Sequence, residues 1–192
     1  MSNALNIRNF AEAIVIQFNR PEIRSPLSIF VLEELHDILD KIAEDRKIQT
    51  IIFTGKEDVF ASGADLREIA KVTPNTAKEF AERGQKLMNK IADSRKLTVA
   101  AVNGFCFGGA LDLALACDKR IASRDATFSH PGANLGIVTG WGGTQRLPRL
   151  IGEAGALEMF LTAKRVGAEE ALRIGLIDAI DDEPLAFSLA NN

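Results

Sequence analysis

The residues best suited to chemistry lie in one stretch, Val102 to Asp118, where a glycine pair is followed by a single acid. A helix is predicted to begin directly after Gly108 and Gly109. The first N–H groups of a helix lack partners within it and carry the positive end of its dipole, so they can stabilise an oxyanion that forms during a reaction. Asp112 follows Gly109 by about one helical turn. The stretch predicts an acid or base beside an oxyanion hole, but it fits equally a tight turn whose glycines serve only packing.

The other residues able to bind metals or act as nucleophiles form no motif. The chain has two cysteines, Cys106 and Cys117, and two histidines, His36 and His130, and their spacing matches no zinc site. Both cysteines stand among apolar residues, which favours buried thiols over nucleophiles. We therefore expect no metal site. Two free thiols without a disulfide framework suit a reducing compartment, and the cytoplasm is the expected location.

Composition narrows the class of protein. The 192 residues suit a single domain, with 46% hydrophobic and 26% charged residues. A net charge of −3, with no basic block, argues against a nucleic-acid partner or a membrane surface. Tyrosine is absent and Trp141 is the only tryptophan, so stacking platforms for bases are not expected. No run reaches the length of a transmembrane helix, and the N-terminus lacks the apolar core of a signal peptide.

The elements that must position these residues alternate between strands and helices. β-Branched and apolar runs predict strands, and apolar residues at helical spacing predict amphipathic helices. Strands are predicted over 13–18, 48–54, 97–102, 119–123, 126–128 and 176–180, and helices over 31–42, 66–70, 77–91, 153–162 and 168–174. This alternation predicts an α/β layered fold. The glycine-rich segment 130–143 is predicted as a long loop, and such loops are often functional.

Five stretches together resemble the crotonase family, which is the enoyl-CoA hydratase/isomerase superfamily. They occur in the family's order and spacing and cover almost the whole chain. The stretches are Ile16–Pro21 (IQFNRP), Phe60–Ile69 (FASGADLREI), Ala100–Asp118 (AAVNGFCFGGALDLALACD), Gly140–Gly152 (GWGGTQRLPRLIG) and Leu161–Asp178 (LTAKRVGAEEALRIGLID). The resemblance implies an α/β fold built as a spiral of ββα units, and an acyl-CoA thioester as the small-molecule ligand. Coenzyme A would enter as part of the substrate, with no separate cofactor.

The resemblance also implies roles for particular residues. An oxyanion hole would be formed by the backbone N–H groups of Ala64 and Gly109, which agrees with what the helix start suggests independently. Ser62 and Asp65 would lie near the adenine end of CoA, and Arg24 would contact the CoA phosphates. Trp141 is expected to line the acyl pocket or to pack the loop that carries it.

The chain departs from the family at the catalytic acids. Family hydratases use two glutamates, and the first would fall at Asp112, whose stem is one methylene shorter. The second would fall at Gly132, where no carboxylate exists. His130 is the nearest other titratable residue in sequence, and histidine is a competent acid or base near neutral pH. It could replace the missing glutamate if the loop turns it inward; otherwise it is a capping or core histidine.

The family usually continues past the GLIDAI stretch with helices that cover the acyl pocket and help to hold a trimer. Here only 181–192 remain, so we expect the C-terminal helical region to be short or missing. The predicted organisation is a crotonase-like domain over 1–180 and a short polar tail over 181–192. A homo-oligomer, trimer or hexamer, is expected if this C-terminus permits it.

Three functions remain open from the sequence. The first is an enoyl-CoA hydratase or isomerase, in which Asp112 handles water or a proton and the oxyanion hole polarises the thioester carbonyl. The second is decarboxylation or hydrolysis of an acyl-CoA, because decarboxylation needs the oxyanion hole more than paired carboxylates. The third is a non-catalytic acyl-CoA binder, which the missing glutamate and the short C-terminus would suit.

Overall fold

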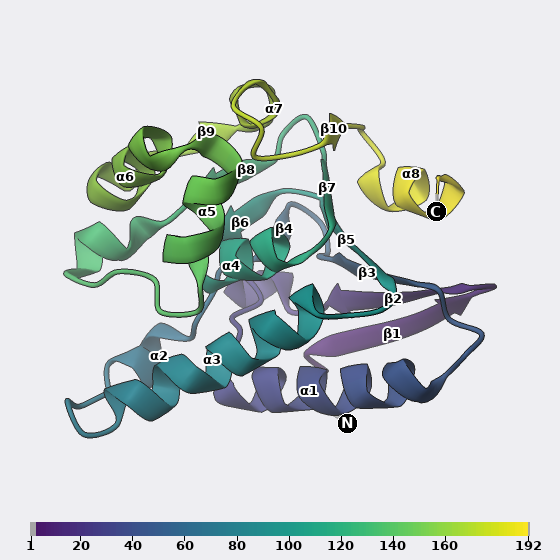
Figure 1. Ribbon diagram of the computed structural model, residues 1–192, viewed down its shortest axis with the longest axis horizontal. Helices are drawn as coiled ribbons and strands as arrows, with labels where there is room; N and C mark the ends of the chain where they lie inside the picture. The colour runs from purple at the N-terminus through teal and green to yellow at the C-terminus, as the bar shows by residue number, and fades with distance from the viewer. Residues whose placement is uncertain (1–2, 192) are drawn as a thin grey trace.

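Two β-sheets form the centre of the computed structural model, which describes residues 3–191 (Figure 1). The larger sheet has the order β1-β2-β3-β5-β7-β10 and the smaller has the order β4-β6-β8-β9. The larger contains β1 (Leu5–Phe10), β2 (Ala13–Phe18), β3 (Thr50–Thr54), β5 (Leu97–Val102), β7 (Lys119–Ala122) and β10 (Ala179–Ile180). The smaller contains β4 (Val59–Ala61), β6 (Phe105–Phe107), β8 (Thr127–Ser129) and β9 (Val166–Gly167). The β1–β2 and β8–β9 pairs are antiparallel, and the other pairs are parallel.

Successive strands from β3 to β8 alternate between the two sheets, and this alternation produces a spiral. Strands β3, β5 and β7 lie in the larger sheet, and each is followed directly by a strand of the smaller sheet, namely β4, β6 and β8. The remaining elements are η1 (Pro21–Ile23), α1 (Ile29–Glu44), α2 (Leu66–Ile69), α3 (Ala77–Ala92), α4 (Gly109–Ala116), η2 (Pro131–Leu135), α5 (Gly143–Ile151), α6 (Glu153–Thr162), α7 (Ala168–Arg173) and α8 (Pro184–Ala190). Helices follow each pair of strands, so the predicted spiral of ββα units is confirmed.

Alternating residues of the central strands face two different cores. On one face Ile51, Phe53 and Val102 join the main core with residues of α1, α3 and α4. On the other face a smaller cluster contains Ile52 and Val99. This alternation follows from the two-residue period of a strand, and a fully buried strand therefore reads as a continuous apolar run. Because the strands are buried on both faces, their ends are held rigidly where they enter the loops.

The segment 181–192, predicted as a short polar tail, contains a helix that the sequence did not predict. Its described residues include α8, which packs against β3, β5 and β7 on the second face of the larger sheet (Figure 1). Leu185, Phe187 and Leu189 lie on the smaller cluster of buried residues. Burial of these three side chains outweighs the polar composition that favoured a tail.

Several short elements were not predicted from the sequence. Strands β4 and β6 have three residues each and lie within stretches that read as a polar loop and a glycine-rich turn. Strand β1 and helix α5 were also missed, and the predicted strand 176–180 is reduced to β10. Strands this short show no clear periodicity, and β4 and β6 become evident only through their parallel pairing. No helix within residues 3–191 is both long and apolar enough to cross a membrane.

Candidate active site

Two loops approach each other closely at the start of α4 and present a pair of backbone N–H groups. Gly63 has φ +86°, and a Cβ at this position would lie 2.5 Å from the backbone N of Gly109 and 2.6 Å from the carbonyl O of Phe107. Glycine is therefore required at position 63. Within residues 3–191, no backbone hydrogen bond outside helices and strands is donated by Ala64 or Gly109. Both lie on the same cavity wall, so their N–H groups are free to bind a ligand oxygen.

Asp112 lies in the first turn of α4 and is fully buried. The hydroxyl of Thr139 donates a hydrogen bond to its Oδ2, whereas no described residue donates one to its Oδ1. Burial raises the pKa of Asp112 to about 7, because a charged carboxylate loses the solvation of water. The Thr139 hydrogen bond, the charge of Arg146 and the backbone N–H groups of Trp141 and Gly143 oppose this rise. Asp112 is thus poised to exchange a proton near neutral pH.

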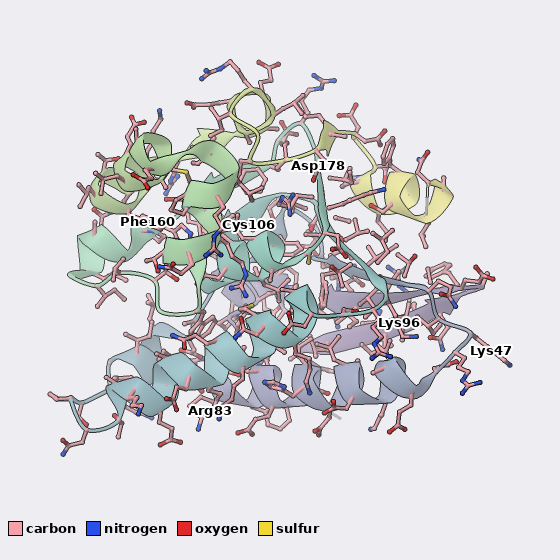
Figure 2. The ribbon with its side chains drawn as sticks, in the orientation of Figure 1. Lys47, Arg83, Lys96, Cys106, Phe160 and Asp178 are labelled. Carbon is pink, nitrogen blue, oxygen red and sulfur yellow. The ribbon has the colours of Figure 1, made fainter. Side chains whose placement is uncertain are left out.

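His130 is turned inward, at the junction of β8 and η2, and is 2% exposed. Its Nε2 lies 3.6 Å from Asp112 Oδ1. Its ring packs against that of Phe160 of α6, with the ring centroids 5.0 Å apart, and Phe160 is labelled in Figure 2. Among the described residues, neither ring nitrogen has a hydrogen-bond partner. Burial lowers the pKa of His130 to about 4, so the ring is neutral at pH 7. A neutral ring offers one donor and one acceptor to a ligand or water in the cavity.

A cavity of about 380 Å³ lies between α2, α3, the start of α4 and the loop 130–141, and Asp112 is not among the residues that line it. Ala64, Gly109, His130 and Thr139 all contribute to its wall. The remaining wall is largely apolar and includes Leu66, Ile69, Val72, Phe80, Ile137 and Val138. A few convergent polar groups at one end of an apolar cavity are typical of a small-molecule site. The arrangement fits an apolar chain that carries a carbonyl group at the polar end.

Trp141 lies on the cavity wall and is 3% exposed. Its indole fills the space in which a Cβ on either Gly84 or Gly109 would lie. Phe80 of α3 packs beside it, with the ring centroids 6.0 Å apart. Trp141 therefore joins α3 to the start of α4 and fixes the turn that carries the Gly109 N–H. The structure places this residue both on the cavity and in the packing of its loop.

Gly132 also lines the cavity, at the position where the family would carry its second acid. A Cβ here would lie 2.6 Å from the carbonyl O of Ile137, because the backbone of 132–137 is folded back on itself. Ile137 N donates to Gly132 O at 3.0 Å and closes this turn. A side chain at position 132 therefore requires the loop to change its backbone path.

The three predicted CoA contacts are placed differently from one another. Ser62 lines the cavity. The carboxylate of Asp65 accepts a hydrogen bond from Arg67 N at the start of α2 and pairs with the Arg67 guanidinium at 2.6 Å. This hydrogen bonding to Arg67 lowers the pKa of Asp65. The Arg24 guanidinium lies 4.9 Å from the centroid of the Phe105 ring. Neither Asp65 nor Arg24 lines the cavity.

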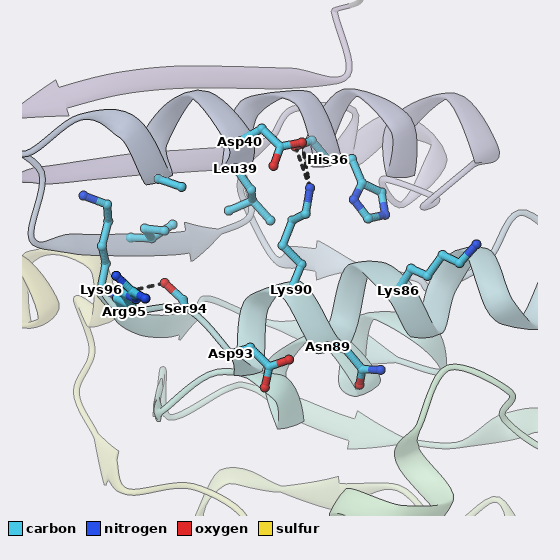
Figure 3. Close-up of a pocket in the computed structure, with 12 residues that line it drawn as sticks. His36, Leu39, Asp40, Lys86, Asn89, Lys90, Asp93, Ser94, Arg95 and Lys96 are labelled. Carbon is cyan, nitrogen blue, oxygen red and sulfur yellow. Dashed lines mark hydrogen bonds and ion pairs between the residues drawn. The ribbon is translucent and has the colours of Figure 1, made fainter.

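A larger hollow of about 700 Å³ lies elsewhere, between the C-terminal halves of α1 and α3 (Figure 3). Lys90 crosses it and pairs with Asp40 at 2.8 Å, and Lys86 and Arg95 stand at its margin (Figure 3). Its charged side chains are exposed or only half-buried, and it contains no buried acid facing a free donor. The smaller cavity is therefore the better candidate for chemistry, despite its size.

Sequence reasoning missed Thr139, Phe160 and Gly84 as parts of the site. The hydrogen bond from Thr139 joins residues 27 positions apart, and it depends on how the loop 130–141 folds. Neither the type nor the spacing of Thr139 marks it. Gly84 stands in a predicted helix, where a glycine costs about 1 kcal/mol relative to alanine, and this cost was the one available signal of close packing.

The fold and the cavity together define a class of protein: a ββα spiral with two free N–H groups on a cavity wall and one buried acid in the first turn of the adjoining helix. Residues 9–186 match the family model described as enoyl-CoA hydratase/isomerase. The chain is 40% identical over 167 residues to the crotonyl-CoA hydratase of Syntrophomonas wolfei, covering 86% of this chain and 64% of that protein. It is 36% identical over 179 residues to the short-chain-enoyl-CoA hydratase of Clostridium acetobutylicum, covering 93% of this chain and 69% of that protein.

A solved structure gives the same result for the fold. The enoyl-CoA hydratase of Thermoplasma volcanium superposes with a TM-score of 0.93 and 31% identity, covering 99% of this chain and 77% of that one. The protein belongs to the enoyl-CoA hydratase/isomerase family, as its motifs predicted.

Proposed function

We propose that the protein is an acyl-CoA-processing enzyme that adds water to the double bond of a 2-enoyl-CoA thioester, or shifts that double bond. One observation carries this proposal: the free N–H groups of Ala64 and Gly109 share a cavity wall, and the buried Asp112 lies in the first turn of the helix that begins at Gly109. The names of the two relatives support an enoyl-CoA substrate. As proposed, the reaction requires no cofactor beyond the CoA that the substrate carries.

The proposed hydration uses the oxyanion pair and one carboxylate. The thioester oxygen accepts hydrogen bonds from Ala64 N and Gly109 N, which stabilise the negative charge of the enolate. Water attacks the β-carbon, and its proton passes to the Asp112 carboxylate. The protonated Asp112 then returns this proton to the α-carbon as the carbonyl re-forms. A pKa of about 7 suits both steps, because it permits the two protonation states at neutral pH.

His130 receives a different role from that of the family's second glutamate. Because the pKa of His130 is lowered to about 4, its ring is neutral and is a weak proton donor at pH 7. The position of Nε2, 3.6 Å from Asp112 Oδ1, suits a ring that binds the attacking water together with the carboxylate. We propose that His130 orients this water and that the proton passes through Asp112.

The pH dependence of kcat/KM follows from the two pKa values. The active base is the Asp112 carboxylate, so kcat/KM should rise with pH, reach half its maximum near pH 7 and then level off. Below that point it should fall about tenfold for each pH unit, which is the dependence of a single ionisation. Initial rates across acid and alkaline buffers check this. A half-maximum near pH 4, where an ordinary carboxyl titrates, would contradict the role given to Asp112.

The substrate class is tested with crotonyl-CoA, by following the loss of its conjugated-thioester absorbance. The proposal expects turnover above that of an Asp112→Ala control, with 3-hydroxybutyryl-CoA as the product. Absence of any difference between the two proteins, with both shown to be folded, would remove hydration from consideration.

A second candidate is decarboxylation or hydrolysis of an acyl-CoA, which the geometry at Gly132 favours because neither a second carboxylate nor space for one is present. A panel of malonyl-type and aryl thioesters, assayed for carbon dioxide and free CoA, separates this candidate from hydration. Calorimetric binding of CoA esters without any product would instead indicate a non-catalytic binder.

Finally, we propose that the protein works as a homo-oligomer, a trimer or hexamer, in the cytoplasm. Exposed leucines on α5 and α6, namely Leu150, Leu157 and Leu161, support an interface between copies. Two buried free thiols suit a reducing compartment. Sedimentation velocity of the purified protein, with Leu157→Lys as a comparison, tests the assembly: the variant should sediment as a monomer.

A further inference from the structure

Thr139 holds one oxygen of the buried acid and leaves the other free. Its hydroxyl donates a hydrogen bond to Asp112 Oδ2, from a loop to a helix 27 residues away in sequence. Oδ1 has no donor among the described residues and faces His130 Nε2 at 3.6 Å. The carboxyl group therefore has one oxygen anchored to the protein and one directed toward the imidazole.

The surroundings of Thr139 fix the direction of its hydroxyl. Its Cγ2 methyl lies 2.9 Å from where a Cβ on Gly143 would stand, so the methyl occupies the space beside that glycine. With the methyl on this side, the hydroxyl points toward α4. A threonine side chain is stiff at χ1, so this orientation is maintained at little entropic cost.

Removal of the hydroxyl would leave both carboxyl oxygens without a side-chain donor in a fully buried site. Such a carboxyl favours its neutral form, with only the backbone N–H groups of Trp141 and Gly143 and the charge of Arg146 left to oppose this. The other titratable or charged groups near Asp112 are His130 at the end of β8, Arg146 on α5 and the Cys106 thiol on β6. None of them occupies the place of the Thr139 hydroxyl on Oδ2.

We propose that Thr139 is a positioning residue for the reaction, which fixes the Asp112 carboxylate so that Oδ1 faces His130, a residue of the cavity wall. This inference rests on the proposed function for its effect on rate, but its effect on the carboxyl group itself requires no turnover. Thr139 does not transfer a proton in this scheme; it acts through Asp112.

The test compares Thr139→Val, which keeps the branched shape, with Thr139→Ser, which keeps the hydroxyl. The protonated carboxyl of Asp112 is titrated by infrared difference spectroscopy, with Asp112→Asn in each background to assign the band. Loss of a hydrogen bond to a charged group should move the Asp112 titration upward by about one to two pH units in Thr139→Val. Thr139→Ser should titrate as the unchanged protein does.

The second measurement is of kcat and KM with crotonyl-CoA as the substrate. In Thr139→Val, kcat at pH 7 should fall about tenfold or more, with KM changed less, and the acid limb should move with the infrared titration. Thr139→Ser should restore both. An infrared titration that is the same in Thr139→Val and in the unchanged protein would overturn the proposal.

The two proposals fail in different ways. If the unchanged protein does not hydrate crotonyl-CoA, the proposed function fails, while the infrared titration still decides whether Thr139 controls the carboxyl. Circular dichroism melts of each variant check folding. If Thr139→Val does not fold, the comparison of Thr139→Ala with Thr139→Ser takes its place, with the same expected direction.

Discussion

Asp112→Asn should lower kcat for hydration by about 10²- to 10⁴-fold, with KM for the thioester changed much less. The amide has nearly the same size as the carboxyl, and its oxygen can still accept the Thr139 hydrogen bond. It cannot take a proton from water, so only the step that needs a base is lost. Steady-state kinetics with crotonyl-CoA at pH 8, where Asp112 is ionised, measure this effect.

The stability of the same variant provides the control for folding. The pKa of Asp112 is raised on folding, so the carboxyl contributes stability at low pH that is lost as pH rises through about 7. Asparagine has no such ionisation. Above pH 7 Asp112→Asn should therefore melt no lower than the unchanged protein, and its advantage should disappear in acid. Asp178→Asn is the matched substitution, at a half-exposed carboxylate that pairs with the buried Arg120, and it should retain activity. A stable Asp112→Asn variant with undiminished kcat would show that Asp112 is not the base.

Gly109→Ala should lower kcat/KM by about 10²- to 10³-fold, the loss typical of one oxyanion-hole donor. The added methyl would overlap the indole of Trp141, and it would stand 3.3 Å from Ala64 N, within the space where the thioester oxygen is proposed to bind. The backbone N–H of residue 109 remains, but its alignment is lost and the site is partly filled. Turnover of crotonyl-CoA and calorimetric binding of its saturated analogue, butyryl-CoA, measure the two effects separately.

Gly167→Ala is the matched control, because nothing lies within 4 Å of a Cβ at position 167 and its φ of −79° suits any residue. It should retain full activity. The double variant Gly109→Ala with Trp141→Ala distinguishes the two causes. Relief of the indole contact should restore stability but not turnover, since the methyl still stands beside Ala64 N. Full recovery of turnover would mean that the oxyanion site lies elsewhere.

Backbone features of the site could be predicted from the sequence better than side-chain contacts. The glycine pair at 108–109 predicted the Gly109 N–H donor from turn geometry, and the resemblance of the motif around Ala64 to the family implied the second donor. The hydrogen bond between Thr139 and Asp112 could not be predicted. It depends on the path of a glycine-rich loop, which tertiary packing decides.

The helices and strands likewise divide into those that the sequence predicted and those that it did not. Long periodic segments such as α1 and α3 were predicted close to their observed bounds, whereas β4 and β6 have only three residues each and show no period. Helix α8 was missed for another reason. It has only seven residues, so the i, i+4 spacing of Leu185 and Leu189 occurs once and is too short a signal to mark an amphipathic helix.

The packing of Trp141 against Gly84 and Gly109 has a consequence for the history of this chain. While the indole is present, a methyl group at either glycine overlaps it, so both positions are closed to change. Replacement of Trp141 by a small residue would open Gly84 to drift in one step. Once Gly84 had gained a side chain, tryptophan could not return without a second, reverse substitution. Loss of the tryptophan therefore takes one substitution, whereas its return takes two once Gly84 has changed.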